Sequence, residues 1–224
     1  MALTVDDIVN KRVRILLRDV DDGGIQWKDS ELITWFNDAC GEVARLRPES
    51  SSATEDVPTS AGSRQAVPDG GSMLLEVICN QVSGVPGRAV RRVDRHMLDN
   101  EDPEWLTAPQ TDTAFRYVPS MTDPRTFYTY PPSTGSSNAG LSIVYAKPPT
   151  VVTDVSDTCP LPDMYAAILV NYICFRAFQK QIESTAAQNR AAEFLALFNA
   201  QVGDTDRNME QRNAKSRQPM NPAQ

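Results

Sequence analysis

Apolar residues recur at intervals of three and four near both ends of the chain. Valine, isoleucine and leucine follow this spacing in the range 5–20, and a second run with the same spacing covers 32–46, which predicts two helices. Thr4 is the expected cap of the first helix, and Asp29 or Ser30 that of the second. An acidic loop that contains glycine separates the two runs, so we expect a helical hairpin.

The helical spacing returns after Pro160. Asp163 is the expected cap of a third helix that is apolar on nearly every side, which is typical of a buried helix. Arg176 is the charged exception within it. Because an isolated buried charge is costly, we expect Arg176 to pair with a carboxylate of the second helix, either Asp38 or Glu42.

A fourth helix is expected to begin at Ser184 and to end at Gly203, a residue type that readily adopts the left-handed conformation found after many helices. An apolar stripe runs along this segment, so the four helices are expected to pack as an antiparallel bundle. The bundle core is expected to contain the aromatic residues Trp35, Phe36, Tyr172, Phe175, Phe178, Phe194 and Phe198.

Between these helical regions the periodicity changes. Proline, glycine and serine divide the chain into short pieces rich in valine, isoleucine and tyrosine, which is typical of strands. The candidate strands are 64–67, 74–78, 89–93, 115–118, 127–130 and 141–146. The predicted fold class is α+β, a helical bundle with an inserted small antiparallel β-sheet or sandwich. The predicted parts are an N-terminal helical hairpin at 1–56, the β domain at 57–152, the C-terminal helices at 153–203 and an extended tail at 204–224.

The tail contains almost no apolar side chains and cannot bury enough surface to fold alone. Its basic residues are Arg207, Arg212, Lys215 and Arg217, which slightly outnumber its acidic ones. Two interpretations stay open: plain disorder, or a segment that becomes ordered against a neighbouring subunit.

Charge and composition narrow the function classes. The formal net charge of the 224-residue chain is −7, whereas free nucleic-acid binders draw most of their affinity from basic contacts to phosphate. An acidic surface would instead suit the wall of a DNA channel. The four cysteines lack metal-ligand spacing and His96 is the sole histidine, so we expect no cofactor or structural zinc. Cys40 and Cys174 are expected to be buried free thiols.

Charged residues interrupt every apolar run in the N-terminal region, so this region does not look like a secretory signal. The longest uncharged apolar stretch, 164–175, is shorter than the roughly 20 residues that span a bilayer. We therefore expect no membrane partner and an intracellular site of synthesis.

Two segments carry candidate chemistry. The range 94–104 is rich in carboxylates and includes His96, and such a cluster can hold magnesium for a phage nuclease. Four arginines, at positions 88, 91, 92 and 95, lie just before this segment or within it. Such a group of arginines would suit a DNA-binding packaging factor. Solvated acidic loops and local salt bridges are the commoner explanations of such runs. The nuclease and the DNA-binding factor remain alternatives.

Several residues occur along the chain in the same order as in a known protein family. In the front half these residues are Arg14, Leu16, Asp19, Trp27, Asp29, Glu31, Leu32 and Asn37. Further along they are the ranges 62–65, 93–99, 103–105, 127–132, 145–148 and 176–177, together with Asn80. With these landmarks the chain resembles the head-to-tail adaptor family of tailed bacteriophages, also called connector or tail tubular protein A, over roughly residues 5–203.

This resemblance implies a structural protein of the virion rather than an enzyme. It implies a ring of identical subunits, dodecameric in most relatives, that binds beneath the portal protein and contacts the tail nozzle or a neck protein. The ring would leave a channel for genomic DNA, without sequence-specific contact, and would sit at the head-tail junction after assembly in the host cytoplasm. The tail with Arg207, Arg212, Lys215 and Arg217 would contact the portal.

Overall fold

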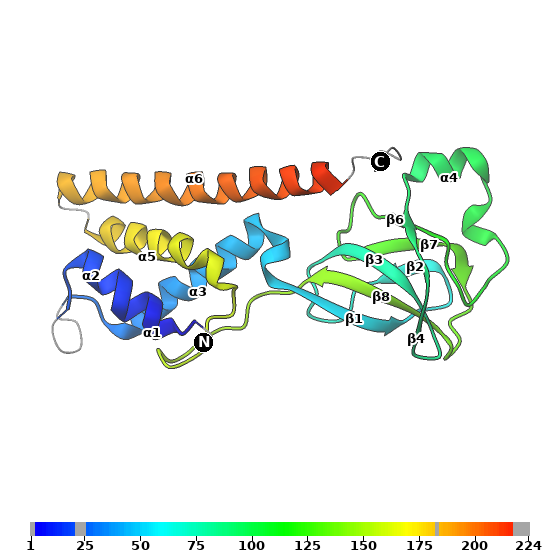
Figure 1. The fold of residues 1–224 in the computed structure, drawn as a ribbon, viewed down its shortest axis with the longest axis horizontal. Helices are drawn as coiled ribbons and strands as arrows, with labels where there is room; N and C mark the ends of the chain where they lie inside the picture. The colour runs from blue at the N-terminus through cyan, green and yellow to red at the C-terminus, as the bar shows by residue number, and fades with distance from the viewer. Residues whose placement is uncertain (1–2, 21–25, 182–183, 217–224) are drawn as a thin grey trace, which may run out of the picture. The chain divides into compact units, whose positions relative to one another are not determined.

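The computed structural model describes residues 3–20, 26–181 and 184–216, with side chains described as far as Gly203. The chain forms two compact units, a helical unit of Met1–Arg47 with Pro149–Gln224, and a β unit of Pro48–Pro148 (Figure 1). The β unit is therefore an insertion in the sequence of the helical unit.

The helical unit begins with one helical stretch built from α1 (Val5–Ile8), a π-helical turn (Val9–Val13) and α2 (Arg14–Leu17). Thr4 caps it as expected: its hydroxyl accepts a hydrogen bond from the backbone N–H of Asp7, whose carboxylate accepts one from the Thr4 N–H. This reciprocal arrangement is a capping box and pairs two amide donors that the helix leaves free.

The second helix, α3, spans Asp29–Leu46, and Lys28 occupies its N-cap without a side-chain capping bond. The expected cap at Asp29 or Ser30 is therefore wrong. Asp29 lies in the first turn instead, where a carboxylate is favoured by the helix dipole, and it pairs with Arg14.

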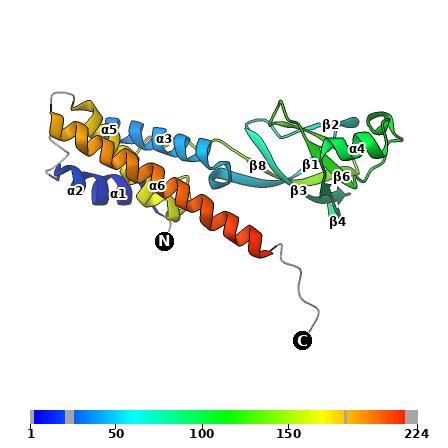
Figure 2. The ribbon, with the colours of Figure 1, turned by 90° about the horizontal axis from the view of Figure 1, so that it is seen from above.

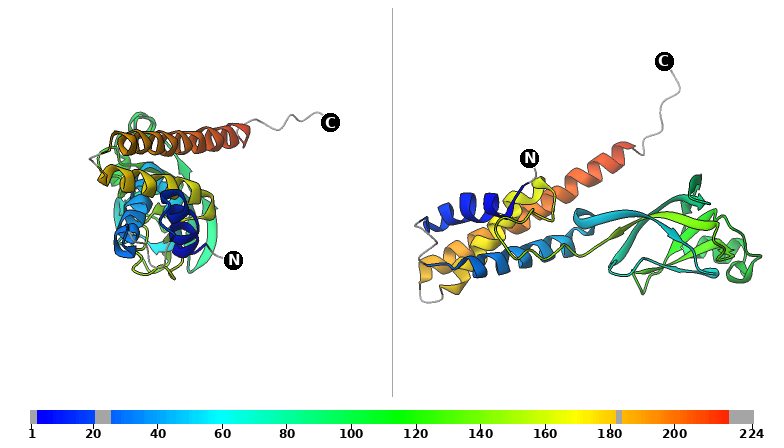
Figure 3. Two further views of the ribbon diagram at one scale, coloured as in Figure 1. Left: turned by 90° about the vertical axis from the view of Figure 1, so that its left-hand side faces the viewer. Right: turned by 90° about the horizontal axis from the view of Figure 1, so that it is seen from below.

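The C-terminal part contains α5 (Ala166–Lys180), which follows a 3₁₀ turn at Asp163–Tyr165, and α6 (Thr185–Ser216). Figures 1 and 3 show α5 between α6 on one side and the N-terminal helices on the other, so α5 is the central helix of the unit. Its nearly all-round apolar sequence fits this position.

The structure corrects the predicted end of the fourth helix. Ser184 does begin it, since its hydroxyl accepts a hydrogen bond from the Ala187 N–H. Gly203 does not end it, because α6 continues to Ser216 and runs beyond the end of α5 (Figure 2). The prediction of an extended conformation is therefore also wrong for residues 204–216. A glycine inside a helix costs only about 1 kcal/mol, and the residues that follow contain no proline before Pro219.

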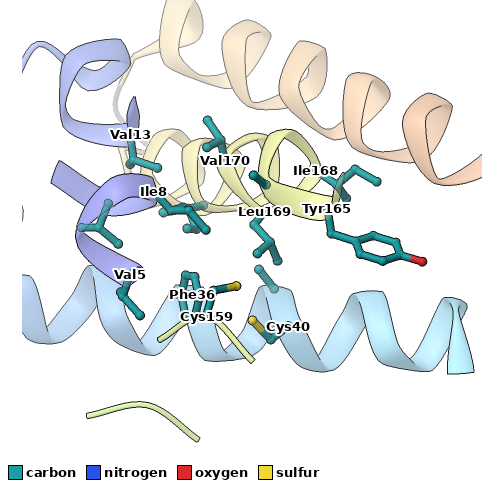
Figure 4. Packing of buried hydrophobic residues seen from close by; sticks show 14 of the residues in the cluster. Val5, Ile8, Val13, Phe36, Cys40, Cys159, Tyr165, Ile168, Leu169 and Val170 are labelled. Carbon is teal, nitrogen blue, oxygen red and sulfur yellow. The ribbon is translucent and has the colours of Figure 1, made fainter. Parts of the chain in front are cut away.

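The main core of the helical unit joins α1, α3, α5 and α6 (Figure 4). Of the predicted core aromatics, Phe36 and Phe198 are fully buried in it, and Trp35, Tyr172 and Phe194 pack against it while partly buried. A smaller cluster between α5 and α6 contains Phe178, Ala187 and Ala191, with Phe175 and Phe194 packed on it. The predicted aromatic set is therefore divided between two clusters.

The β unit contains two four-stranded sheets. One has the order β1-β8-β3-β4 and the other β2-β7-β6-β5. The bounds of the strands are β1 Ser52–Pro58, β2 Gly62–Ala66, β3 Met73–Val82, β4 Val85–Ala89, β5 Arg91–Arg92, β6 Arg116–Pro119, β7 Thr126–Ser133 and β8 Ala139–Ala146. Helix α4 (Arg95–Glu101) and two 3₁₀ turns, Pro48–Ser51 and Trp105–Thr107, complete the unit.

A shared core packs the two sheets together as a sandwich. Val77, Ile143 and Tyr145 of the first sheet join Tyr117 and Phe127 of the second in one buried cluster. All strand pairs are antiparallel except β5 with β6, which are parallel, so the expectation of a wholly antiparallel β domain needs that correction.

Two strands differ from the predicted set. β1 lies outside every candidate strand, yet it pairs with β8 from Ser52 to Pro58. The predicted strand 89–93 is split, because β4 ends at Ala89 and β5 begins at Arg91, with the buried Val90 between them.

All four outer strands of the two sheets carry features that hinder further pairing. β1 contains Glu55 and Asp56 and ends in Pro58, and β4 contains Pro86. β2 has an irregular register near Gly62, and β5 has only two residues, both arginine. Charges, prolines, bulges and short length are the usual protections of sheet edges.

Candidate functional site

A buried arginine ties the N-terminal helical stretch to the start of α3. The side chain of Arg14 is almost inaccessible, and its Nε donates to Asn10 Oδ1 at 2.9 Å. Nη1 donates to Asp19 at 2.8 Å, both terminal nitrogens donate to the Trp27 carbonyl at 3.2 Å, and Nη2 pairs with Asp29. The planar guanidinium presents its donors in a fixed fork, which here binds both ends of the segment between α2 and α3.

Asp19 completes this network. Its side chain is about 5% exposed, and its carboxylate accepts hydrogen bonds from the backbone N–H groups of Gln26 and Trp27, each at 3.2 Å. A buried charge is tolerated only when paired and hydrogen-bonded, and both conditions hold here. Arg14, Asp19, Trp27 and Asp29 were separate landmarks in the sequence, and the structure brings them together.

Two further landmark residues are asparagines whose side-chain amides form hydrogen bonds with backbone groups. Asn37 on α3 donates to the Val152 carbonyl at 2.9 Å and accepts from its N–H at 3.0 Å. In the β unit the fully buried Asn80 donates to the carbonyls of Arg88 and Ala114 and accepts from the Ala114 N–H at 2.7 Å. Asn37 thus fixes the chain at Val152 and Asn80 fixes it at Ala114, and neither of these two positions belongs to a strand or helix.

An open groove of about 520 Å³ lies between α3 and α5. Trp35 lines it together with the two cations of α5. Arg176 pairs with Asp38 at 3.3 Å, which confirms the expected partner, and Lys180 pairs with Glu31 at 2.6 Å. These half-exposed ion pairs each contribute little to stability, and the cations of both pairs line the groove together with Trp35.

The helical unit also exposes apolar side chains. Ile15, Leu16 and Val20, at the end of the N-terminal helical stretch, are 59%, 48% and 66% exposed. A second groove, of about 340 Å³, lies between α5 and α6 and is lined largely by Phe175, Leu195 and alanines. Clustered exposed apolar residues are typical of protein interaction surfaces.

The acidic segment 94–104 is occupied by local structural contacts. Asp94 caps α4 through the His96 N–H at 2.8 Å, and Asp99 accepts from the Trp105 indole at 2.8 Å. Glu101 pairs with Arg116, and Asp102 accepts from the Tyr130 hydroxyl. Within the described ranges no group of three or more histidine, cysteine, aspartate or glutamate side chains is arranged to hold a metal ion.

The four arginines of the DNA-binding alternative do not share one element. Arg88 lies on β4 with its guanidinium 4.8 Å from the Phe115 ring centre, and Arg95 on α4 pairs with Asp99. Arg91 and Arg92 form the short strand β5. Two of the four therefore have partners of their own.

The tail residues proposed to contact the portal fall at the end of α6. Arg207, Arg212 and Lys215 lie within the helical range, and Arg217 lies outside the described residues. No helix in the described part of the chain has the length and hydropathy needed to cross a bilayer.

The described residues thus combine buried polar networks that fix the backbone with exposed grooves and apolar side chains on the surface. A family model described as SU10 adaptor protein matches residues 3–223. The chain belongs to this family of phage head-to-tail adaptors. It is accordingly an adaptor structural protein of a phage, a virion component that associates with other head or tail proteins. A search of curated proteins finds no match to the chain.

Proposed function

We propose that this chain is one subunit of a ring, a dodecamer as in most of the adaptors it resembles, located between the portal and the tail nozzle or a neck protein. The family match over nearly the whole chain carries this proposal. In it the ring joins head to tail mechanically and leaves an axial channel for DNA. The net charge of −7 supports this proposal, because DNA does not adhere to an acidic channel wall.

The exposed apolar side chains of the helical unit support contact between neighbouring subunits. A closed ring needs two different complementary faces on each subunit. Ile15, Leu16 and Val20 would form one of them, and the grooves that border α5 in the next copy would form the other. The helical units would then build the ring wall, and the β unit would contact the tail-side protein.

The tail, residues 204–224, is assigned to the portal. It has almost no apolar residues that could hold it against its own subunit. Its charged groups suited to a protein partner are Arg207, Arg212, Lys215 and Arg217.

The first test is the mass of the purified protein in solution, alone and with portal rings, by native mass spectrometry. A species of twelve times the 24.7 kDa subunit mass is expected, either free or only on the portal. A protein that remains monomeric with and without portal rings would refute the proposed function.

A matched pair of variants tests the subunit contact. Leu16→Asp places a charge in the proposed interface and is expected to leave a folded monomer that no longer forms the ring. Leu197→Asp alters a leucine of similar exposure on α6, 50% against 48%, and is expected to assemble normally. Rings formed equally well by both variants would exclude the N-terminal apolar face as the contact.

Removal of residues 204–224 tests the portal assignment. Because Val202 is the last core residue among the described side chains of α6, the truncated protein is expected to remain folded with an unchanged unfolding midpoint but to lose binding to portal rings. Normal binding by the truncated protein would show that the portal contact lies elsewhere.

A further inference from the structure

Two cysteines far apart in the sequence meet in the core of the helical unit. Cys40 lies on α3, and Cys159 lies in the segment that leads from the β unit to α5. Both are free thiols, and their side chains form a hydrogen bond with each other. Figure 4 shows them next to one another beside Phe36.

The two thiols have different environments. Cys40 is 1% exposed and lies within a helix, whereas Cys159 is 8% exposed and lies in a segment without regular secondary structure. That segment contains short turns, such as the one in which the Asp157 carboxylate accepts from the N–H groups of Thr153 and Asp154. It is also tied to the N-terminus, where the Cys159 N–H donates to the Leu3 carbonyl at 2.8 Å. Cys159 is the more exposed thiol of the pair, so it is the one that a small molecule reaches first.

The hydrogen bond also makes the two thiols chemically unequal. Donation from Cys40 lowers the pKa of Cys159, and the backbone N–H of Leu161 lowers it further, whereas the same contact and burial raise the pKa of Cys40. Cys174, buried in the same core, has its pKa raised to about 12 by burial. Since the thiolate is the reactive form, Cys159 is the nucleophile of the pair.

We propose that Cys40 and Cys159 form an oxidisable pair that hydrogen peroxide converts into a disulfide inside the helical unit. The Cys159 thiolate attacks one peroxide oxygen, the O–O bond breaks, and a sulfenic acid and a hydroxide ion form. The Cys40 sulfur then attacks the sulfenic sulfur, and the S–OH bond breaks with release of water that carries the thiol proton. The two sulfurs together lose two electrons, which the peroxide accepts.

This bond would have a specific topological effect. The chain between Cys40 and Cys159 contains the complete β unit, so the disulfide would close a covalent loop around the insertion. Closure of a long loop restricts the unfolded chain, and the helical unit is therefore expected to unfold at a higher temperature after oxidation.

The test uses the full chain treated with hydrogen peroxide, followed by denaturation, alkylation of the remaining thiols and mass spectrometry. The wild type is expected to lose two of its four alkylatable thiols, to yield one cross-linked peptide pair that contains Cys40 and Cys159, and to regain the thiols with dithiothreitol. Cys159→Ser is expected to lose none by cross-linking, and Cys174→Ser, the matched control, to lose two as the wild type does.

Peptide mapping of the wild type decides the matter even if a variant fails to fold. Four thiols that persist after treatment, or a cross-link that involves Cys79 or Cys174, would overturn the proposal. Neither result depends on whether the protein forms a ring, so the outcome is separate from that of the proposed function.

Discussion

Replacement of Arg14 by alanine is expected to destabilise the helical unit more than any exposed charge reversal. Arg14 makes hydrogen bonds to Asn10, Asp19 and the Trp27 carbonyl and an ion pair with Asp29. Its removal leaves the Asp19 carboxylate, about 5% exposed, without a counter-charge. Loss of one partner of a buried ion pair costs about 3 to 5 kcal/mol, a large part of the roughly 5 to 15 kcal/mol by which domains are stable.

Three comparisons separate this explanation from a general effect of charge. Arg12→Ala removes an exposed arginine two positions away and is expected to change stability by no more than about 0.5 kcal/mol. Asp29→Asn, at a side chain 52% exposed, is expected to cost about 1 kcal/mol or less. Arg14→Lys keeps the charge but not the planar fork, and an intermediate cost is expected because one ammonium cannot reach all the acceptors.

The assay is urea unfolding followed by far-ultraviolet circular dichroism, which reports mainly on the helical unit because the long helices belong to it. The shift of the midpoint, at an unchanged slope, gives the change in stability. An Arg14→Ala cost below about 1 kcal/mol, or one equal to that of Arg12→Ala, would refute the view that this network holds the α2 to α3 connection.

Two other predictions concern the same unit. Phe198→Ala is expected to cost about 3 to 5 kcal/mol because the ring is fully buried, whereas Phe175→Ala should cost clearly less because that ring is partly exposed in a groove; equal costs in urea unfolding would contradict this. Hydrogen bonds from Lys11 and Thr4 hold the pKa of Asp7 well below its ordinary 3.8. A lowered folded-state pKa means that the stabilisation is complete above pH 3.8 and is lost as the pH falls towards the folded-state value. Wild type and Asp7→Asn should therefore differ in unfolding midpoint at neutral pH and converge in acid; a constant difference would show that the Asp7 charge is unimportant.

The helices could be predicted because their signals are local. Val5, Ile8 and Val13 share a face by spacing alone and are all buried, and Thr4 provides a cap that needs no distant partner. The Arg176 to Asp38 pair was also predictable, because a single charge in an otherwise apolar helix requires a carboxylate from a neighbouring helix.

The features that escaped prediction depend on partners far away in the sequence. β1 is a strand because β8 offers it a full register from Ser52 to Pro58, while its own residues are mostly polar. The Arg14 network depends on the approach of both Asp19 and Trp27 to the guanidinium, and the spacing of charges does not encode that approach. Gly203 is ambiguous, since the same residue can end a helix or lie within one.

The features that protect the sheet edges also affect the risk of aggregation between β units at high local concentration. In the proposed ring the β units would lie at high local concentration, where open sheet edges would join strand to strand into fibres. Pro58 and Pro86 remove amide donors from two of these edges, Arg91 and Arg92 place positive charge on a third, and the irregular register near Gly62 interrupts the fourth. Such a ring could therefore pack its subunits closely with a low risk of amyloid-like aggregation, and recognition between them would be left to side chains.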